Sequence, residues 1–464
     1  MKDKKDKLKA KLPRGFKDNQ EDVISLRNAV SDVIKNECQK YAFSEIDTST
    51  IEYSESLGKF LPDSDRPEGG VFSFQDEDGQ WLSLRYDLTA PLARYVAENY
   101  QYLNKPFKRY QTGLVFRNEK PGPGRFREFL QFDADVIGIQ SSFIDAELCI
   151  MVSNIFLKLG LGFDKFCIKY SNRQIWDKLF SDNKINGELQ TLVLRAIDKK
   201  DRVGEDGVKQ LLTKGRKDKS GDFMKGVGLS DSQASNIIEF LNSKTQTNEQ
   251  LEEFNNYLSN YKDYPIVFDP SIVRGLDYYT GMVFEAELLI KVKNDKNQNV
   301  IFGSVAGGGR YDKLVSRFGG EDIPATGISI GIDRLIVALK QENLLQSNKQ
   351  PLVVVANMDE NLLSNYLEIA DEIRANNIAC EISFGNKNLA KQLKYCDKKN
   401  ADVVIIAGQD EFDKKELSIK NLALGKKISE NITERSEWKE QRAGQLNIPR
   451  DDLINQLKKI FKTE

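Results

Sequence analysis

The residues best suited to chemistry in this chain are arginines and carboxylates at alternate positions along one predicted hairpin. Its first strand carries Arg117 and Glu119 on one face, and Arg125 follows the Pro- and Gly-rich turn at 120–124 on the corresponding face of the second strand. Guanidinium groups bind phosphate oxygens through paired N–H donors and stabilise the charge that develops at a reacting phosphorus. The hairpin therefore predicts a polar site for an anion such as a polyphosphate.

An ordinary half-solvated sheet is the alternative interpretation of this hairpin. Solvated strand faces tend to carry Lys, Glu and Thr. Here the polar positions of both strands hold Arg, Gln and Asp, which favours the floor of a polar site. The positions concerned are Arg109 and Gln111 on the first strand and Gln131, Asp133 and Asp135 on the second.

Two further arginines lie in motifs outside the hairpin. Arg274 begins the segment RGLDYYTG, and Arg334 lies where TGISIGIDRLIVAL (326–339) changes from a strand pattern to a helix pattern. The chain has no P-loop, and the glycines at 307–309 lack the spacing of a dinucleotide-binding turn, so a tight backbone approach is the simpler interpretation of them. A nucleotide, if one is bound, must be held by arginines.

The chain contains no histidine. Histidine is the commonest general base near neutral pH and the commonest metal ligand, so catalytic triads and His-ligated zinc or haem sites are excluded. The 68 basic and 70 acidic residues give a net charge of −2, which does not support a globally basic nucleic-acid-binding surface. We expect no dedicated metal site, and charged groups, amides, tyrosines and backbone must carry the chemistry.

The cysteines and the hydropathy pattern indicate a cytoplasmic protein. Five cysteines, an odd number without a CxxC pair, are typical of reduced thiols. No apolar run is long enough to cross a bilayer, and the Lys-rich first 15 residues lack the apolar core of a signal peptide. We expect no membrane contact.

Three elements must position the polar residues. Apolar residues at helical spacing predict one long helix over 22–41. The alternation in LSLRYDL predicts a strand over 82–88, after which Thr89 is expected to cap a helix that opens with Ala90-Pro91. The hairpin itself spans 108–139, and Asp87 falls at the end of the preceding strand.

Pattern and composition predict an α/β multidomain protein. Residues 1–170 and 265–341 form the two parts of one core, interrupted at 171–264 by a charged, helical insertion without a strand pattern. A linker at 342–351 precedes a β-α-β-α-β pattern over 352–464, which predicts a small α/β domain with a largely parallel sheet.

These motifs resemble those of the histidyl-tRNA synthetases, a family of class II aminoacyl-tRNA synthetases. FRNEKPGPGRFREFLQFDADVIG (116–138) resembles class motif 2, and TGISIGIDRLIVAL resembles motif 3. RGLDYYTG (274–281) and AGGGRYDKLV (306–315) resemble two signatures of the histidine enzymes. RYDLT (85–89) is similar to the eukaryotic-like and alphaproteobacterial branch. The resemblance implies a class II catalytic domain built on an antiparallel sheet flanked by helices, with a helical insertion and a C-terminal anticodon-binding domain.

The resemblance implies that ATP activates L-histidine to histidyl-adenylate, and that the histidyl group passes to the 3′ end of tRNA(His). Position by position, Arg117 would contact the α-phosphate and Glu119 the adenine. Arg125 and Arg334 would hold the outer phosphates, and Arg274 would act beside the α-phosphate as a catalytic cation together with Arg117. Mg²⁺ on the nucleotide and a homodimer are also implied.

The resemblance likewise implies a histidine pocket. The substrate ammonium would be bound by Asp87, Thr89 and Gln131, and the imidazole would face Asp135 and Tyr279. Tyr311 would line the same pocket. Two acceptor-rich strand faces suit such a substrate, because an ammonium and an imidazole N–H both need acceptors.

A regulatory relative without catalysis is the alternative function. The regulatory subunit of ATP phosphoribosyltransferase resembles these enzymes, but it typically lacks the C-terminal unit and the ATP-binding arginines. This chain has both, which favours the synthetase.

Overall fold

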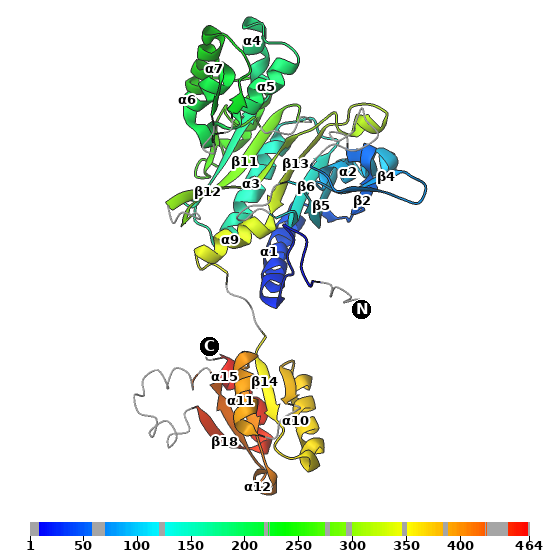
Figure 1. Cartoon of the computed structure of the whole chain (residues 1–464), viewed down its shortest axis with the longest axis vertical. Coiled ribbons are helices and arrows are strands. Elements are labelled where there is room, and N and C mark those ends of the chain that lie inside the picture. Colours follow the sequence, from blue (N-terminus) through cyan, green and yellow to red (C-terminus); the bar gives the residue numbers. More distant parts are fainter. Residues whose placement is uncertain are drawn as a thin grey trace, which may run out of the picture. The chain divides into compact units, whose positions relative to one another are not determined.

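The computed structural model describes most of the chain, in two compact units that comprise Met1–Ser347 and Asn348–Glu464 (Figure 1). The described residues are 9–57, 70–119, 126–217, 221, 223–273, 279–293, 299–345, 350–383, 388–422, 424 and 444–462. The predicted positions Arg125 and Arg274, and the hairpin turn at 120–124, lie outside them.

The larger unit is built on one eight-stranded sheet, in the order β1-β5-β6-β13-β12-β11-β7-β10. The pairings between β5 and β7 are antiparallel, whereas β1 and β10 join the edges in parallel. The strands are β1 (Ser44–Glu45), β5 (Phe107–Phe116), β6 (Glu128–Ile137), β7 (Phe166–Asn172), β10 (Ile266–Phe268), β11 (Met282–Lys293), β12 (Asn299–Arg310) and β13 (Ala325–Gly331). Strands β5 and β6 confirm the predicted hairpin.

One face of this sheet forms the main hydrophobic core with helices α1 (Glu21–Lys40), α3 (Phe143–Lys158) and α9 (Ile332–Gln341). The long N-terminal helix is confirmed, and Arg334 lies in the first turn of α9, as predicted. The apolar positions of the hairpin point into this core, where Tyr110 stacks on Phe132 with ring centroids 5.5 Å apart. Alternation then directs the polar positions of β5 and β6 to the opposite face.

That opposite face is covered by helix α2 (Thr89–Asn99) and the short 3₁₀ helix η2 (Val315–Phe318). Beside them lies a small antiparallel sheet of β2 (Ile51–Tyr53), β4 (Trp81–Leu84) and β3 (Ser73–Gln75), with the 3₁₀ helix η1 (Ser54–Leu57). The predicted strand over 82–88 was too long, because β4 ends at Leu84.

The predicted cap of α2 was also wrong. Thr89 lies within the helix, and the side chain of Asp87 caps it instead: its Oδ1 accepts from the backbone N–H groups of Thr89 (3.2 Å) and Ala90 (2.9 Å). A carboxylate at this end also complements the positive end of the helix dipole. Asp87 is thereby fixed at the rim of the polar face.

Helices dominate the segment between β7 and β10. They are α4 (Ile175–Asp182), α5 (Glu188–Ile197), α6 (Lys200–Leu212), α7 (Asp231–Ser243) and α8 (Glu249–Leu258). The expectation of no strands here was wrong, because β8 (Gly215–Lys217) pairs antiparallel with β9 (Phe223–Lys225). Strands of three residues are too short for alternation to reveal them.

The smaller unit contains a five-stranded sheet in the order β15-β14-β16-β17-β18. The first three strands are parallel, whereas β17 and β18 are antiparallel, so the sheet is mixed rather than largely parallel. The strands are β14 (Leu352–Ala356), β15 (Ala379–Ser383), β16 (Val403–Ile406), β17 (Glu416–Asn421) and β18 (Gln445–Pro449), with helices α10 (Leu363–Ala375), α11 (Leu389–Lys398), α12 (Gln409–Asp413) and α15 (Leu453–Lys462). Within the described parts of both units, no helix combines the length and the apolar character needed to cross a membrane.

One ion pair ties α1 to α9 and to β6. Arg27 donates to both carboxylate oxygens of Asp333, from Nε at 2.7 Å and from Nη2 at 2.6 Å. The same carboxylate accepts from the backbone N–H of Leu130 at 3.0 Å. Because both side chains are largely buried, this contact fixes the start of α9, where Arg334 follows.

We expect Asp333→Ala to lower the free energy of unfolding by about 2 to 4 kcal/mol, because it leaves a buried guanidinium and a backbone N–H without their acceptor. Asp22→Ala is the matched control. It removes the exposed contact of Asp22 with Lys340, 3.9 Å apart, which also joins α1 to α9. Urea unfolding measures both, and equal losses in the two variants would contradict this account.

Candidate functional site

The polar positions of the hairpin form a buried cluster of charge on the face covered by α2. Arg109 and Asp133 are fully buried, and Asp135 is 2% exposed. Cross-strand register places Arg109 beside Asp135 on β5 and β6, and Gly327 and Ser329 of β13 flank the two aspartates on the other side. The half-solvated alternative is therefore wrong, because water does not reach these side chains.

The two carboxylate oxygens of Asp135 have different partners inside this cluster. Its Oδ1 accepts from the hydroxyl of Tyr311 at 2.5 Å, and its Oδ2 lies 2.8 Å from Nη2 of Arg109 as an ion pair. No described residue donates a hydrogen bond to that Oδ2. Burial raises the pKa of Asp135, and Arg109 opposes this rise. The arrangement suits an N–H donor that approaches Oδ2.

Glycines make the room for this carboxylate. A Cβ added to Gly327 would lie 1.9 Å from Oδ1 of Asp135. On β12, a Cβ at Gly308 would lie 2.0 Å from the carbonyl oxygen of Gly327, and one at Gly309 would lie 2.9 Å from the ring of Tyr279. The Gly-rich run is thus a close backbone approach, as predicted, and it allows the ring of Tyr279 to lie against β12.

Asp133 binds the two neighbours that the sequence assigned to an ammonium. Nε2 of Gln131 donates to its Oδ1 at 2.8 Å, and the hydroxyl of Thr89 donates to its Oδ2 at 3.4 Å. Burial and the charge of Asp135 together raise the pKa of Asp133 to about 7, although Arg109 opposes the rise. The aspartate therefore requires compensation when it is ionised.

Arg117 and Glu119 follow the last residue of β5, at the turn end of the hairpin, and both contact Tyr86. The guanidinium of Arg117 lies 4.5 Å from the ring centroid of Tyr86 and 5.1 Å from that of Phe129. The carboxylate of Glu119 accepts from the Tyr86 hydroxyl at 2.8 Å. Aromatic faces beside a guanidinium provide a stacking surface as well as charge.

Arg334 lies at the start of α9 against strand β12. Its Nη2 donates to the carbonyl oxygen of Phe302 at 3.0 Å, and its guanidinium carbon lies 5.0 Å from the Phe302 ring centroid. The structure thus brings Thr89, Gln131, Asp135 and Tyr311 into one cluster with Asp87 at its rim, whereas Arg117 with Glu119 and Arg334 occupy separate places on the sheet.

The sequence interpretation gave no role to three buried residues of this region. The alternation of side chains along the hairpin placed Asp133 and Arg109 on the polar face, and this was the signal in the sequence that could have identified them. Arg310 was missed within the Gly-rich motif: its Nη2 pairs with Oδ2 of Asp145 at 2.6 Å, and both side chains are fully buried. Since Tyr311 is the next residue, this ion pair anchors the strand end from which Tyr311 reaches Asp135.

Comparisons with known proteins agree over both units. The family described as "Histidyl-tRNA synthetase" matches residues 15–335, and that described as "Anticodon binding domain" matches residues 351–460. A histidine–tRNA ligase of Brucella suis biovar 1 is 43% identical over 100% of this chain and 98% of its own length. That of Mesorhizobium japonicum is 44% identical with the same coverage.

A solved structure is similar over both units as well. The histidyl-tRNA synthetase of Nostoc sp. PCC 7120 superposes with a TM-score of 0.71 at 27% identity, covering 98% of this chain and 100% of that one. With a class II catalytic sheet followed by an α/β anticodon-binding domain, this chain belongs to the histidyl-tRNA synthetase family.

The titration of Asp133 has a consequence for stability. The folded chain keeps its proton up to a pKa of about 7, whereas the unfolded chain loses it near 3.8, so stability falls as the pH rises through this interval. We expect Asp133→Asn to flatten this decline and, at about pH 8, to be more stable than the wild type by up to roughly 4 kcal/mol. Asp263→Asn, at an exposed aspartate, is the control. Urea unfolding across this pH range tests it, and parallel profiles for wild type and Asp133→Asn would contradict it.

Proposed function

We propose that this chain is a cytoplasmic ligase that uses ATP to activate L-histidine as histidyl-adenylate and then transfers the histidyl group to the 3′ end of tRNA(His). The observation that carries this proposal is the buried cluster around Asp135, whose Oδ2 accepts no hydrogen bond from a described residue and so has capacity for an imidazole N–H. Family membership and the anticodon-binding match at 351–460 support the tRNA step.

The pocket recognises the two donor groups of histidine, which are the imidazole N–H and the ammonium. Asp135, oriented by Tyr311 and paired with Arg109, accepts from the imidazole, and Tyr279 lines the same wall. Asp87, Thr89 and Gln131 bind the ammonium. A buried site built to hydrogen-bond a polar substrate rejects analogues without those groups by about 10⁴ to 10⁵, which makes an editing site unnecessary.

ATP is held by arginines. Arg117 contacts the α-phosphate and stacks beside Tyr86, while Glu119 binds the adenine. Arg334 and Arg125 bind the outer phosphates, and Arg274 stabilises charge at the α-phosphorus. Mg²⁺ arrives with the nucleotide, whose phosphate oxygens it prefers as ligands. The part of the chain that the structure describes has no group of three His, Cys, Asp or Glu side chains arranged for a metal ion.

This mechanism needs no histidine side chain. The substrate carboxylate is already a nucleophile, so its attack on the α-phosphorus requires alignment and stabilisation of charge, and the bond to pyrophosphate breaks as the adenylate forms. In the second step the ribose hydroxyl of tRNA attacks the adenylate carbonyl, and AMP leaves. A phosphate oxygen of the adenylate accepts the proton of the ribose hydroxyl.

Histidine-dependent exchange of pyrophosphate into ATP is the direct test. We expect exchange with histidine and with none of the other amino acids, followed by charging of tRNA(His) in the complete reaction. No exchange with histidine, or faster exchange with another amino acid, would refute the proposal. A regulatory relative would bind histidine without exchange, so the assay separates these two functions.

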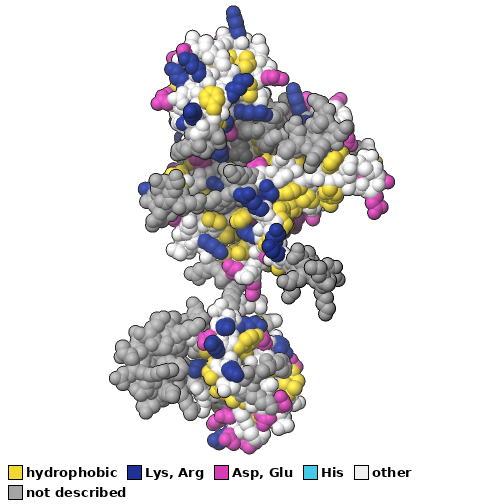
Figure 2. Space-filling model, viewed as in Figure 1, with side chains coloured by type: hydrophobic (Ala, Val, Ile, Leu, Met, Phe, Trp, Pro, Cys, Tyr) yellow, Lys and Arg dark blue, Asp and Glu magenta, His cyan; other side chains and the backbone are white. Residues whose placement is uncertain are grey.

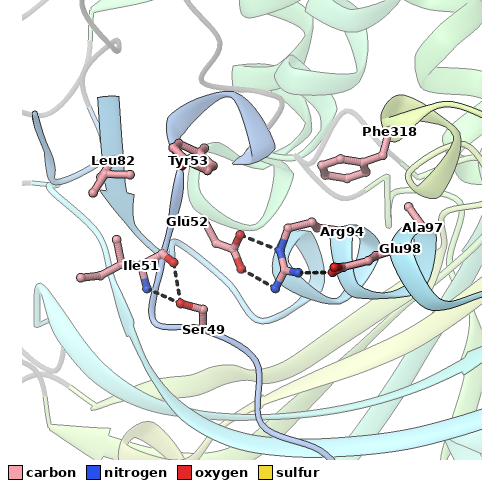
Figure 3. Close-up of a pocket in the computed structure, with 9 residues that line it drawn as sticks. All are labelled: Ser49, Ile51, Glu52, Tyr53, Leu82, Arg94, Ala97, Glu98 and Phe318. Carbon is pink, nitrogen blue, oxygen red and sulfur yellow. Dashed lines mark hydrogen bonds and ion pairs between the residues drawn. The ribbon is translucent and has the colours of Figure 1, made fainter. Parts of the chain in front are cut away.

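We also propose that the enzyme is a homodimer that uses the small sheet. A surface cavity of about 590 Å³ lies between β2, β4 and α2 (Figure 3). Inside it Arg94 donates to both carboxylate oxygens of Glu52, at 2.8 and 3.0 Å. Hydrophobic side chains gather over this part of the unit in Figure 2. Of the residues that line the cavity, Ile51 is 43% and Tyr53 is 52% exposed. A satisfied ion pair surrounded by exposed apolar groups is typical of a protein interface.

We expect the wild type to sediment as a dimer at micromolar concentration and Tyr53→Asp to shift it toward the monomer, because a charge would be buried in the interface. Tyr102→Asp is the matched control, since Tyr102 is 79% exposed and does not line this cavity. A monomeric wild type, or the same shift in both variants, would count against this surface.

A further inference from the structure

The mechanism above leaves one buried carboxylate of the pocket without a role. Asp133 lies on β6 between Gln131 and Asp135, and no part of it is exposed. Its side chain shares one face of the strand with those of Gln131 and Asp135. An ionised carboxylate in this position is costly unless neighbouring groups or a ligand compensate its charge.

The direction of two hydrogen bonds is informative. An ionised carboxylate only accepts hydrogen bonds, so Nε2 of Gln131 and the hydroxyl of Thr89 both donate to Asp133. The amide of Gln131 is thereby turned so that Oε1 faces away from Asp133, and the Thr89 oxygen keeps its lone pairs. The two side chains consequently present acceptors, which are what an ammonium with three N–H donors requires.

The charges around Asp133 point in the same direction. Arg109 is paired with Asp135, and Arg85 pairs with Asp47 at 3.8 Å. Asp133 itself forms no ion pair with a described residue. The groups that face it are the charged Asp135, Arg109 and Arg85 and the neutral Gln131, Ser329 and Thr89. Both arginines are shared with other aspartates, and the pKa of Asp133 still rises, so a cation bound beside Asp133 would add compensating charge.

We propose that Asp133 is the positioning residue of the ammonium subsite: it orients Gln131 and Thr89 as acceptors and provides the negative charge beneath the substrate's amino group. This inference rests on the proposed function and deepens it. It assigns to the pocket a buried residue that never touches histidine but determines which end of the substrate is held by charge.

Two histidine analogues separate this role from a structural one. Histidinol has the ammonium and the imidazole but no carboxylate, and imidazolepropionate has the imidazole and the carboxylate but no ammonium. Their inhibition constants against histidine are measured in the pyrophosphate exchange assay. We expect Asp133→Asn to weaken histidinol by roughly 10- to 100-fold, the scale of a hydrogen bond to a charged group, and to leave imidazolepropionate unchanged.

Glu37→Gln is the matched control. Glu37 is also a buried acidic residue, but it lies on α1, on the opposite face of the sheet. It should change neither constant. An equal loss for both analogues in Asp133→Asn, or no loss for histidinol, would overturn the proposal. A wild-type protein that shows no exchange with histidine would instead overturn the proposed function, so the two failures are distinguishable.

A double-mutant cycle keeps the proposal testable through a second variant. If Asp133 acts through Gln131, then Asp133→Asn combined with Gln131→Met should weaken histidinol by clearly less than the product of the two single effects. The KM for ATP should remain unchanged in Asp133→Asn. Multiplicative effects of the two substitutions, or a parallel rise in the KM for ATP, would show that Asp133 supports the fold rather than the ammonium subsite.

Discussion

The structure of the catalytic unit depends on the burial of carboxylates beneath helix α2. Asp133 and Asp135 lie on one face of β6 with a single buried arginine, Arg109, paired to the second of them. Burying two such charges side by side is unfavourable, and the raised pKa values of both express that cost. The surrounding glycines, tyrosine hydroxyl and amide are arranged around this constraint, and a substrate with two donor groups relieves it.

Other contacts hold this cluster in place from outside. Arg310 pairs with Asp145 below the strand end that carries Tyr311, and Thr326 donates to the same carboxylate at 2.5 Å. On the far face, the Arg27–Asp333 pair sets the start of α9 against β6. Both ion pairs are largely buried, and they hold the end of β12 and the start of α9, two elements that border the cluster.

Much of this arrangement was predictable from local pattern, and the failures have physical reasons. Alternation along 108–139 identified the hairpin and both of its faces, because the period of a strand is two and the register is fixed by a short turn. The sequence could not show that the polar face is buried, since α2 covers it through contacts distant in the chain. The Arg310–Asp145 pair was missed for the same reason, because its residues are 165 positions apart in the chain. The cap at Asp87 is local, and it was missed because the strand was predicted to continue to residue 88.

The central claim is that the buried carboxyl group of Asp133 becomes the counter-ion of a cationic substrate. Calorimetric titration with histidinol near pH 7, in buffers of different ionisation enthalpy, counts the protons released on binding. Burial and the charge of Asp135 raise the pKa of free Asp133 to about 7, so part of the protein carries this proton near pH 7. A bound ammonium favours the ionised form, and the wild type should therefore release more protons on binding than Asp133→Asn. Equal proton release by the two proteins would contradict the claim.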